Sequence, residues 1–96
     1  MFGFSKNKIN KKDFDLIIDV RTRGEFNTGH IKESINIELD DIYSNFENTE
    51  LKNRGKDEKI LLVCRSGNRS EMAKDILESK GFSNLENGGS FEDFIL

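Results

Sequence analysis

Residues 60–70 read ILLVCRSGNRS, and this short window carries the signals of a strand, a tight turn and a helix start. The aliphatic run at 60–63 is typical of a strand that is buried on both faces of a parallel sheet. Gly67 permits the backbone angles that a sharp turn requires, and a helical pattern begins near Ser70. Because binding sites in such sheets lie at the carboxyl ends of strands, Cys64 falls where ligands bind.

Strands and helices alternate on both sides of this window. Residues 34–39 alternate apolar and polar side chains, so one face of that strand is expected to be wetter. The alternation predicts an α/β fold in which helices cover a parallel sheet through right-handed crossovers. The pattern predicts strands at 16–20, 34–39, 60–63 and 84–87, helices at 22–30, 40–46 and 70–80, a turn at Gly88-Gly89, and a last helix that contains Phe91, Phe94 and Ile95.

The helix after the window has the clearest periodicity. Asn68 or Ser70 is expected to cap its start, and Gly81 is expected to end it. Its apolar stripe, which is expected to face the core, contains Met72, Ala73, Ile76 and Leu77.

Length and charge indicate one small domain. A chain of 96 residues is too short for two separate cores. We assign residues 13–96 to the domain, and residues 1–12, which are polar and lysine-rich after two phenylalanines, to a segment at its edge. The 15 basic and 18 acidic residues are mixed along the chain, without the basic patch that holds a nucleic acid.

Other classes of protein are also disfavoured. No apolar run approaches the length of a membrane span, and the start of the chain lacks the apolar core of a secretory signal. A single cysteine can form neither an internal disulfide nor a cysteine-based zinc cluster. We therefore expect a cytoplasmic protein with no nucleic acid or membrane partner, no metal and no cofactor.

Cys64 has two interpretations. A lone cysteine after an apolar run is usually part of the core. Here, however, the turn can point successive N–H groups inward, the following helix presents its positive end, and Arg65 and Arg69 add two charges. These effects lower a thiol pKa. We therefore predict a nucleophilic thiolate at Cys64 beside an anion-binding turn.

Three stretches together resemble a known family. They are DVRTRGEFNTGHIKESINI at 19–37, VCRSGNRS at 63–70 and NGGSFEDF at 87–94. In this order and spacing the chain is similar to single-domain rhodaneses of the sulfurtransferase family. The resemblance implies a three-layer α/β/α sandwich around a small parallel sheet. It also implies a catalytic cysteine that opens a six-residue loop, which here would run from Cys64 to Arg69.

By this resemblance, Cys64 would accept a sulfane sulfur and become a persulfide. The donor would be thiosulfate or a protein or low-molecular-weight persulfide, and the acceptor would be cyanide or a thiol from outside, since the chain has no second cysteine. The loop is expected to cradle the sulfur and the departing anion, with its arginines as anion contacts. The loop residues after the cysteine are Arg65, Ser66, Gly67, Asn68 and Arg69.

Polar residues outside the loop are expected to support it. Asp19, Arg21 and Glu25 are interpreted as an ion-pair network that braces the end of the first strand, and the alternative is that they order the site from behind the loop. His30, the only histidine, is interpreted as a structural hydrogen-bonding residue. The Gly88-Gly89 pair is expected to permit close packing.

Other functions remain as alternatives. A rhodanese-like module could bind a partner or regulate without catalysis, although such modules often lack the cysteine. A cysteine-dependent phosphatase or an arsenate reductase would use a similar cradle. The phosphatase loop, however, places five residues between cysteine and arginine, whereas this chain has four between Cys64 and Arg69.

Overall fold

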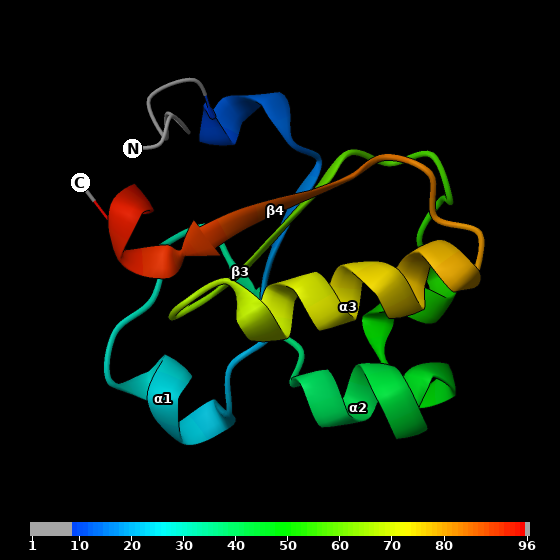
Figure 1. Cartoon of the computed structure of the whole chain (residues 1–96), viewed down its shortest axis with the longest axis horizontal. Helices are drawn as coiled ribbons and strands as arrows, with labels where there is room; N and C mark the ends of the chain where they lie inside the picture. The colour runs from blue at the N-terminus through cyan, green and yellow to red at the C-terminus, as the bar shows by residue number, and fades with distance from the viewer. Residues whose placement is uncertain (1–8, 96) are drawn as a thin grey trace.

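The computed structural model describes residues 9–95, which form a four-stranded parallel sheet (Figure 1). The strand order is β2-β1-β3-β4, so the two central strands are β1 and β3. The α/β fold with a parallel sheet is therefore confirmed. The strands are β1 (Leu16–Asp19), β2 (Ile35–Asn36), β3 (Ile60–Cys64) and β4 (Leu85–Ser90).

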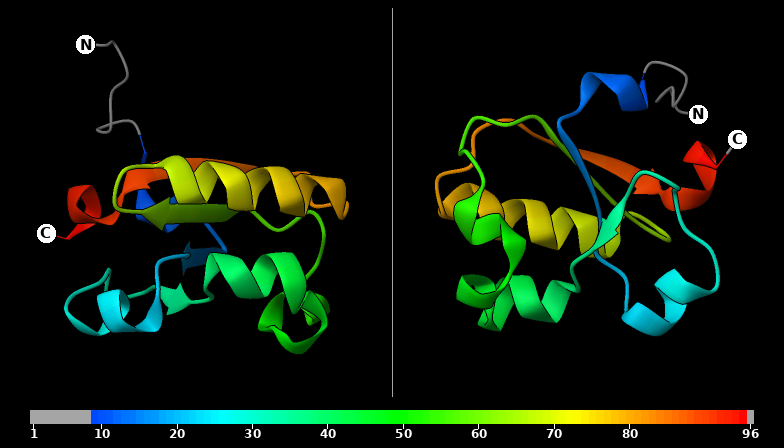
Figure 2. Two further views of the ribbon diagram at one scale, coloured as in Figure 1. Left: turned by 60° about the horizontal axis from the view of Figure 1, so that its bottom comes forward. Right: turned by 180° about the vertical axis from the view of Figure 1, so that it is seen from behind.

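Helices and short 3₁₀ segments (η) connect the strands. The helices α2 and α3 lie side by side (Figure 2). The helices are α1 (Arg23–Asn27), α2 (Leu39–Ser44) and α3 (Asn68–Ser79), and the 3₁₀ segments are η2 (Lys11–Asp13), η3 (Phe46–Asn48), η4 (Glu50–Asn53) and η5 (Phe91–Phe94).

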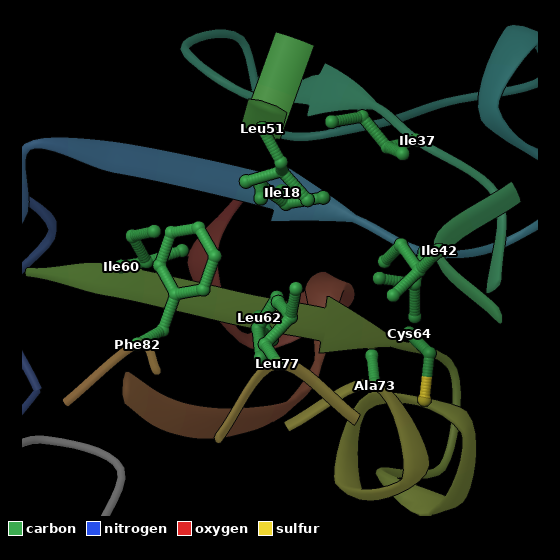
Figure 3. Packing of buried hydrophobic residues seen from close by; sticks show 11 residues of the cluster. Ile18, Ile37, Ile42, Leu51, Ile60, Leu62, Cys64, Ala73, Leu77 and Phe82 are labelled. Atoms are coloured by element: carbon green, nitrogen blue, oxygen red, sulfur yellow. The ribbon is translucent and has the colours of Figure 1, made fainter. Parts of the chain in front are cut away.

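The sheet separates two apolar clusters, because successive side chains of a strand point to opposite faces. Leu62 and Cys64 of β3 face the larger cluster, whereas Leu61 and Val63 face the smaller one. The larger cluster packs beneath α2 and α3 (Figure 3), and it contains Ile18, Val20, Ile37, Ile42, Leu51, Ile60, Leu62, Cys64, Ala73, Leu77 and Phe82. The smaller cluster includes Ile17, Ile31, Phe91 and Phe94. This is the three-layer arrangement that the sequence predicted.

Two boundaries near the ends of the sheet differ from the prediction. The strand expected at 34–39 pairs with β1 only at Ile35 and Asn36, after which the chain turns into α2. The Gly88-Gly89 pair is not a turn but lies inside β4, where the pairing with β3 shifts by one residue between Leu62 and Val63. The last helical segment is a short 3₁₀ helix.

Gly88 explains why glycine is required inside β4. A Cβ at this position would lie 2.9 Å from Leu61 Cδ1, 3.1 Å from Val63 Cγ1 and 3.2 Å from Phe94 Cε2. Side chains of the smaller cluster therefore pack directly against the backbone of β4 at Gly88. The expectation of close packing is confirmed for Gly88, whereas a Cβ on Gly89 would meet nothing within 4 Å.

The helix α3 corrects two predictions about its own surface. Its N-cap is Gly67, and neither Asn68 nor Ser70 caps the helix with a side chain. Met72 is 55% exposed and does not belong to the buried stripe that Ala73 and Leu77 form. The stop at Gly81 is confirmed by its positive φ of 99° immediately after the C-cap.

The start of the described chain lies against the smaller cluster. Ile9 and Phe14 pack on it, and Lys11 forms an ion pair with Glu33 at 3.2 Å. Residues 1–8, which include Phe2 and Phe4, lie outside the described residues. Within residues 9–95, no helix has the length and apolarity to span a bilayer.

Candidate active site

The site lies between β1 and β3, where the chain changes the side of β1 on which it adds strands. From β1 the chain pairs next with β2 on one side, and β3 later adds to the other side of β1. In the β1/β3 register Asp19 is opposite Val63, so the carboxyl ends of both strands meet at one edge. This reversal is the place where open parallel sheets bind ligands. Cys64, the last residue of β3, stands at this edge.

Cys64 is completely buried, and its sulfur has donors close by. The backbone N–H of Gly67 donates to Sγ at 3.0 Å, and the Ser70 hydroxyl oxygen lies 3.4 Å from Sγ. Figure 3 shows the Cys64 side chain beside the first turns of α3. Burial opposes ionisation of the thiol, but the Ser70 hydroxyl and the backbone N–H groups of Ser70, Gly67 and Ser66 outweigh burial and lower the Cys64 pKa. These donors therefore favour the ionised form of the Cys64 sulfur.

Gly67 gives the turn its shape. Its φ of 96° is in the left-handed region, which other L-residues rarely adopt. The turn brings the Gly67 N–H onto the sulfur while the Gly67 carbonyl faces the other way, toward the side chains of Ser70 and Asn87. A side chain at this position would strain the backbone and displace the donor from Cys64.

Arg69 and Glu25 form the main ion pair beside the loop. Arg69 Nη1 lies 2.7 Å from Glu25 Oε1, and Nη2 lies 3.1 Å from Oε2. The bond to Arg69, followed by the N–H of Thr22, lowers the Glu25 pKa to about 2, and the same pair raises the Arg69 pKa. The Glu25 carboxylate thus pairs with Arg69 of the loop, whereas only the Glu25 backbone carbonyl contacts Arg21 at the strand end.

Arg65 lies on the outer side of the loop. It is exposed, with Nη1 at 3.7 Å from Glu92 Oε2 and its guanidinium 5.5 Å from the centre of the Phe91 ring. Ser66 and Asn68 are also exposed, and the Asn68 N–H donates to Ser66 Oγ at 3.4 Å. The loop therefore presents Arg65, Ser66 and Asn68 to solvent above a buried sulfur.

Asp19 and Arg21 form a buried pair behind the site. Both side chains are fully buried, and Arg21 Nη2 lies 2.7 Å from Asp19 Oδ2. Arg21 also donates to the carbonyls of Glu25 and Gly29, and the Phe91 ring stacks on its guanidinium at 3.6 Å. The pair thus links the end of β1 to the backbone of α1 and to η5.

His30 lies away from this network. Its Nδ1 is 2.8 Å from the Phe26 carbonyl oxygen, and its ring stacks on the Phe26 ring at 3.7 Å. These contacts hold the end of α1, and the structural role expected for His30 stays a prediction. Among residues 9–95, no three His, Cys, Asp or Glu side chains gather in the manner of a metal site.

Ser70 and Asn87 are the residues that sequence reasoning missed. Ser70 was considered only as a helix cap, yet its hydroxyl lies between Cys64 and Asn87 Oδ1, which is 2.6 Å away. Asn87 comes from β4 and also donates to the Gly67 carbonyl at 3.0 Å. The position of Ser70 one residue beyond the loop was a usable signal. Asn87 opens the stretch NGGSFEDF, but nothing local in the sequence indicated a role for its side chain.

Comparisons with known proteins agree with the geometry. The model of the rhodanese-like domain matches residues 5–94. A rhodanese domain-containing protein of Drosophila melanogaster is 44% identical over 78 residues, which cover 72% of this chain and 70% of that protein. Thiosulfate sulfurtransferase PspE of Escherichia coli is 29% identical over 79 residues, which cover 82% of this chain and 73% of that protein. A solved structure of a rhodanese with anions from E. coli, 28% identical, superimposes with a TM-score of 0.70 over 81% of this chain and 88% of that one. The chain belongs to the rhodanese-like domain family, as the resemblance of its three sequence stretches predicted.

Proposed function

We propose that this protein is a sulfurtransferase that carries a sulfane sulfur on Cys64 as a persulfide. The observation that carries the proposal is the setting of Cys64 Sγ, which receives the Gly67 N–H at 3.0 Å beside the Ser70 hydroxyl at 3.4 Å. These donors lower the pKa of a thiol at the start of a helix. A thiolate of this kind attacks a sulfane sulfur without needing a general base.

The first half of the reaction loads the cysteine. The Cys64 thiolate attacks the outer sulfur of thiosulfate, a new S–S bond forms, the S–S bond of thiosulfate breaks, and sulfite leaves with the bonding electron pair. A protein or low-molecular-weight persulfide would load Cys64 in the same way, with a thiolate as the leaving group. The exposed cation of Arg65 lies beside the loop and is suited to meet an anionic donor.

The second half unloads it. Cyanide or an external thiolate attacks the outer sulfur, and the Cys64 thiolate is regenerated as the leaving group. The acceptor comes from outside, because Cys64 is the only cysteine of the chain and no internal disulfide can resolve the persulfide. We place this exchange in the cytoplasm, where thiols stay reduced.

The arrangement of Arg69 weighs against a phosphatase or an arsenate reductase. A phosphate cradle would turn the guanidinium N–H groups of its arginine toward the oxyanion. Here Nη1 and Nη2 of Arg69 are both directed at Glu25. The loop also has four residues between Cys64 and Arg69, one fewer than the phosphatase loop, and the shorter ring suits a sulfur atom better than a phosphoryl group.

Intact-mass measurement tests the proposal. The purified protein is incubated with thiosulfate, freed of excess reagent and weighed. We expect a gain of about 32 Da, the mass of one sulfur, which cyanide removes as thiocyanate. Cys64→Ser is the matched control and gains nothing. A sulfur gain that persists in Cys64→Ser refutes the role of Cys64. The absence of any gain with thiosulfate and with a low-molecular-weight persulfide favours a non-catalytic module.

A further inference from the structure

The Ser70 hydroxyl has one hydrogen and three neighbours that can accept it. Ser70 Oγ lies 2.6 Å from Asn87 Oδ1, 3.1 Å from the Gly67 carbonyl oxygen and 3.4 Å from Cys64 Sγ. Ser70 is fully buried, so water is not expected to replace its hydroxyl as a hydrogen-bond donor to these three atoms. A hydroxyl can donate to only one of these atoms at full strength. The three neighbours therefore compete for the same hydrogen.

The orientation of Asn87 follows from its partners. Its Nδ2 lies 3.0 Å from the Gly67 carbonyl oxygen and 2.9 Å from Glu71 Oε1, and an ionised carboxylate and a carbonyl can only accept. The amide must therefore present its two hydrogens to these atoms. Its Oδ1 then faces Ser70 and also accepts the Gly89 N–H at 2.9 Å. Asn87 Oδ1 is a fixed acceptor.

We infer that Asn87 and the Cys64 sulfur compete for the Ser70 hydroxyl hydrogen, so that Ser70 and Asn87 act as positioning residues that set the reactivity of Cys64. While Cys64 is a neutral thiol, its S–H donates to Ser70 Oγ, and the Ser70 hydroxyl donates to Asn87. When Cys64 ionises, its sulfur can only accept. The Ser70 hydrogen then rotates from Asn87 to Sγ, and the bond to Asn87 is lost.

This rotation bears on sulfur transfer, and in that respect it rests on the proposed function. In the persulfide the charge resides on the outer sulfur, so Sγ is neutral and the Ser70 hydrogen can return to Asn87. During unloading, Sγ becomes the leaving thiolate. The Ser70 hydrogen turns back to Sγ as its charge develops, with no proton transferred. A stabilised leaving thiolate departs faster.

Several charged side chains lie on the elements around Cys64, and they are unchanged in the variants that test the inference. The Arg69 pKa is raised mainly by the hydrogen bond to Glu25, and the charges of Cys64 and Asp19 raise it further. Glu71 holds the amide of Asn87. The charged side chains around the site come from the loop, α3, β1 and the residues that follow it, α1 and η5, and they are Arg65, Arg69, Glu71, Asp19, Arg21, Glu25 and Glu92.

The first test measures the Cys64 pKa without any sulfur donor. The rate of alkylation of the full chain by iodoacetamide is followed from pH 5 to 10. Ser70→Ala removes the hydroxyl that lies 3.4 Å from Sγ, and we expect it to raise the apparent pKa by about one unit, the shift that one hydrogen bond produces. Asn87→Ala removes the competing acceptor and is expected to lower the apparent pKa by about half a unit.

The double variant separates competition from general loosening of the loop. In the Ser70→Ala background, Asn87→Ala is expected to have no effect on the pKa, because no hydroxyl hydrogen remains to be released. Asn87→Leu repeats the test with a side chain of similar volume, and circular dichroism checks the fold of each variant. An unchanged pKa in Ser70→Ala overturns the inference. So does an equal shift by Asn87→Ala with and without the Ser70 hydroxyl.

A second measurement follows the unloading step. Protein preloaded with sulfur is mixed with cyanide, and thiocyanate is recorded in a single turnover. We expect Ser70→Ala to unload about five-fold more slowly, as a less stable leaving thiolate requires. Unloading at the unaltered rate, together with a raised pKa, overturns the role in the second half-reaction. If the unaltered protein takes up no sulfur, the proposed function fails, while the alkylation experiment still decides the competition for the hydrogen.

Discussion

Glu25 and Arg69 join α1 to the end of the loop through two nitrogen–oxygen contacts of 2.7 and 3.1 Å. Glu25 Oε1 also accepts the backbone N–H of Thr22 in the capping box of α1. One carboxylate therefore fixes the start of a helix and the last residue of the loop together. The Glu25 carboxylate also neutralises the positive charge of Arg69 near the Cys64 sulfur.

Glu25→Gln is expected to strengthen the use of thiosulfate. Glutamine can still complete the capping box, but it no longer neutralises Arg69, and the potential at the loop becomes more positive. We expect the KM for thiosulfate to fall about three-fold at low ionic strength, with the difference shrinking as salt is added. Steady-state kinetics with cyanide as acceptor measures both effects.

Arg69→Ala is the matched opposite of this change. It leaves the charge of Glu25 without its partner, and we expect the KM for thiosulfate to rise about ten-fold while the fold is retained. A KM that moves in the same direction in both variants would show that charge at the loop does not control donor binding. Unfolding of Arg69→Ala would show that the arginine is mainly structural.

Acid should weaken the fold through Glu25. Its pKa in the folded chain is about 2, below the ordinary 4.5, so the unfolded chain binds the proton more readily. The stabilisation is complete above about pH 5 and is lost as the pH falls toward 2. Because the side chains of the pair are about one-third exposed, we expect it to contribute about 1 kcal/mol. Urea unfolding at several pH values should show a shallower acid dependence in Glu25→Gln.

Arg65→Ala is expected to leave stability unchanged. The ion pair with Glu92 is long at 3.7 Å, and both side chains are more than half exposed, so it adds little to stability. If Arg65 meets the anionic donor, the KM for thiosulfate rises, whereas the rate of unloading by cyanide from preloaded protein stays the same. Slower unloading would instead give Arg65 a part in the second half-reaction.

Arg21→Met should be the most damaging of these substitutions. It leaves Asp19 as a buried carboxylate without its cation and removes donors from two backbone carbonyls. Breaking a buried pair in this way costs about 3–5 kcal/mol, a large fraction of the stability of a small domain. Thermal unfolding followed by circular dichroism measures the loss. A change below about 1 kcal/mol would contradict the bracing role.

Gly88→Ala tests the close approach of β4 to the smaller cluster. The added Cβ would lie 2.9 Å from Leu61 Cδ1, and we expect a loss of about 1–3 kcal/mol. Gly24→Ala in α1 is the control, because its Cβ meets nothing within 4 Å and alanine is the better helix former. Equal effects of the two substitutions on urea unfolding would contradict the packing account.

The sequence was most informative where the structure is encoded locally. β3, Gly67 and α3 follow one another within twenty residues, and their aliphatic run, glycine and helical period can be recognised without knowledge of distant parts. The position of Cys64 at a strand end followed directly from these signals. The sequence correctly pointed to N–H groups of the turn, since the Gly67 N–H lies 3.0 Å from Sγ. It missed the Ser70 hydroxyl, and Arg69, on which the prediction also relied, is paired with Glu25.

Contacts between distant segments could not be predicted. Asn87 reaches Ser70 only because β4 pairs with β3, and the shift of register inside β4 has no local signature. The prediction of a turn at Gly88-Gly89 was wrong. Glycine pairs usually indicate turns, but here Gly88 lies in a strand because its neighbours leave no room for a side chain. Met72 has the spacing of a core residue, but it is exposed, and Ala73 and Leu77 are the apolar residues of α3 that are buried in the core.

The pairing of the two central strands also determines when Cys64 acquires its lowered pKa. Leu16 of β1 pairs with Ile60 of β3, so the chain between them must close as one long loop before the centre of the sheet exists. Before closure, Cys64 is an ordinary thiol on an open chain, exposed and mostly protonated near neutral pH. The lowered pKa is thus a property of the finished fold. Because folding also buries the sulfur completely, the pH dependence of thiol alkylation, and not its rate at one pH, distinguishes the folded chain from the open one.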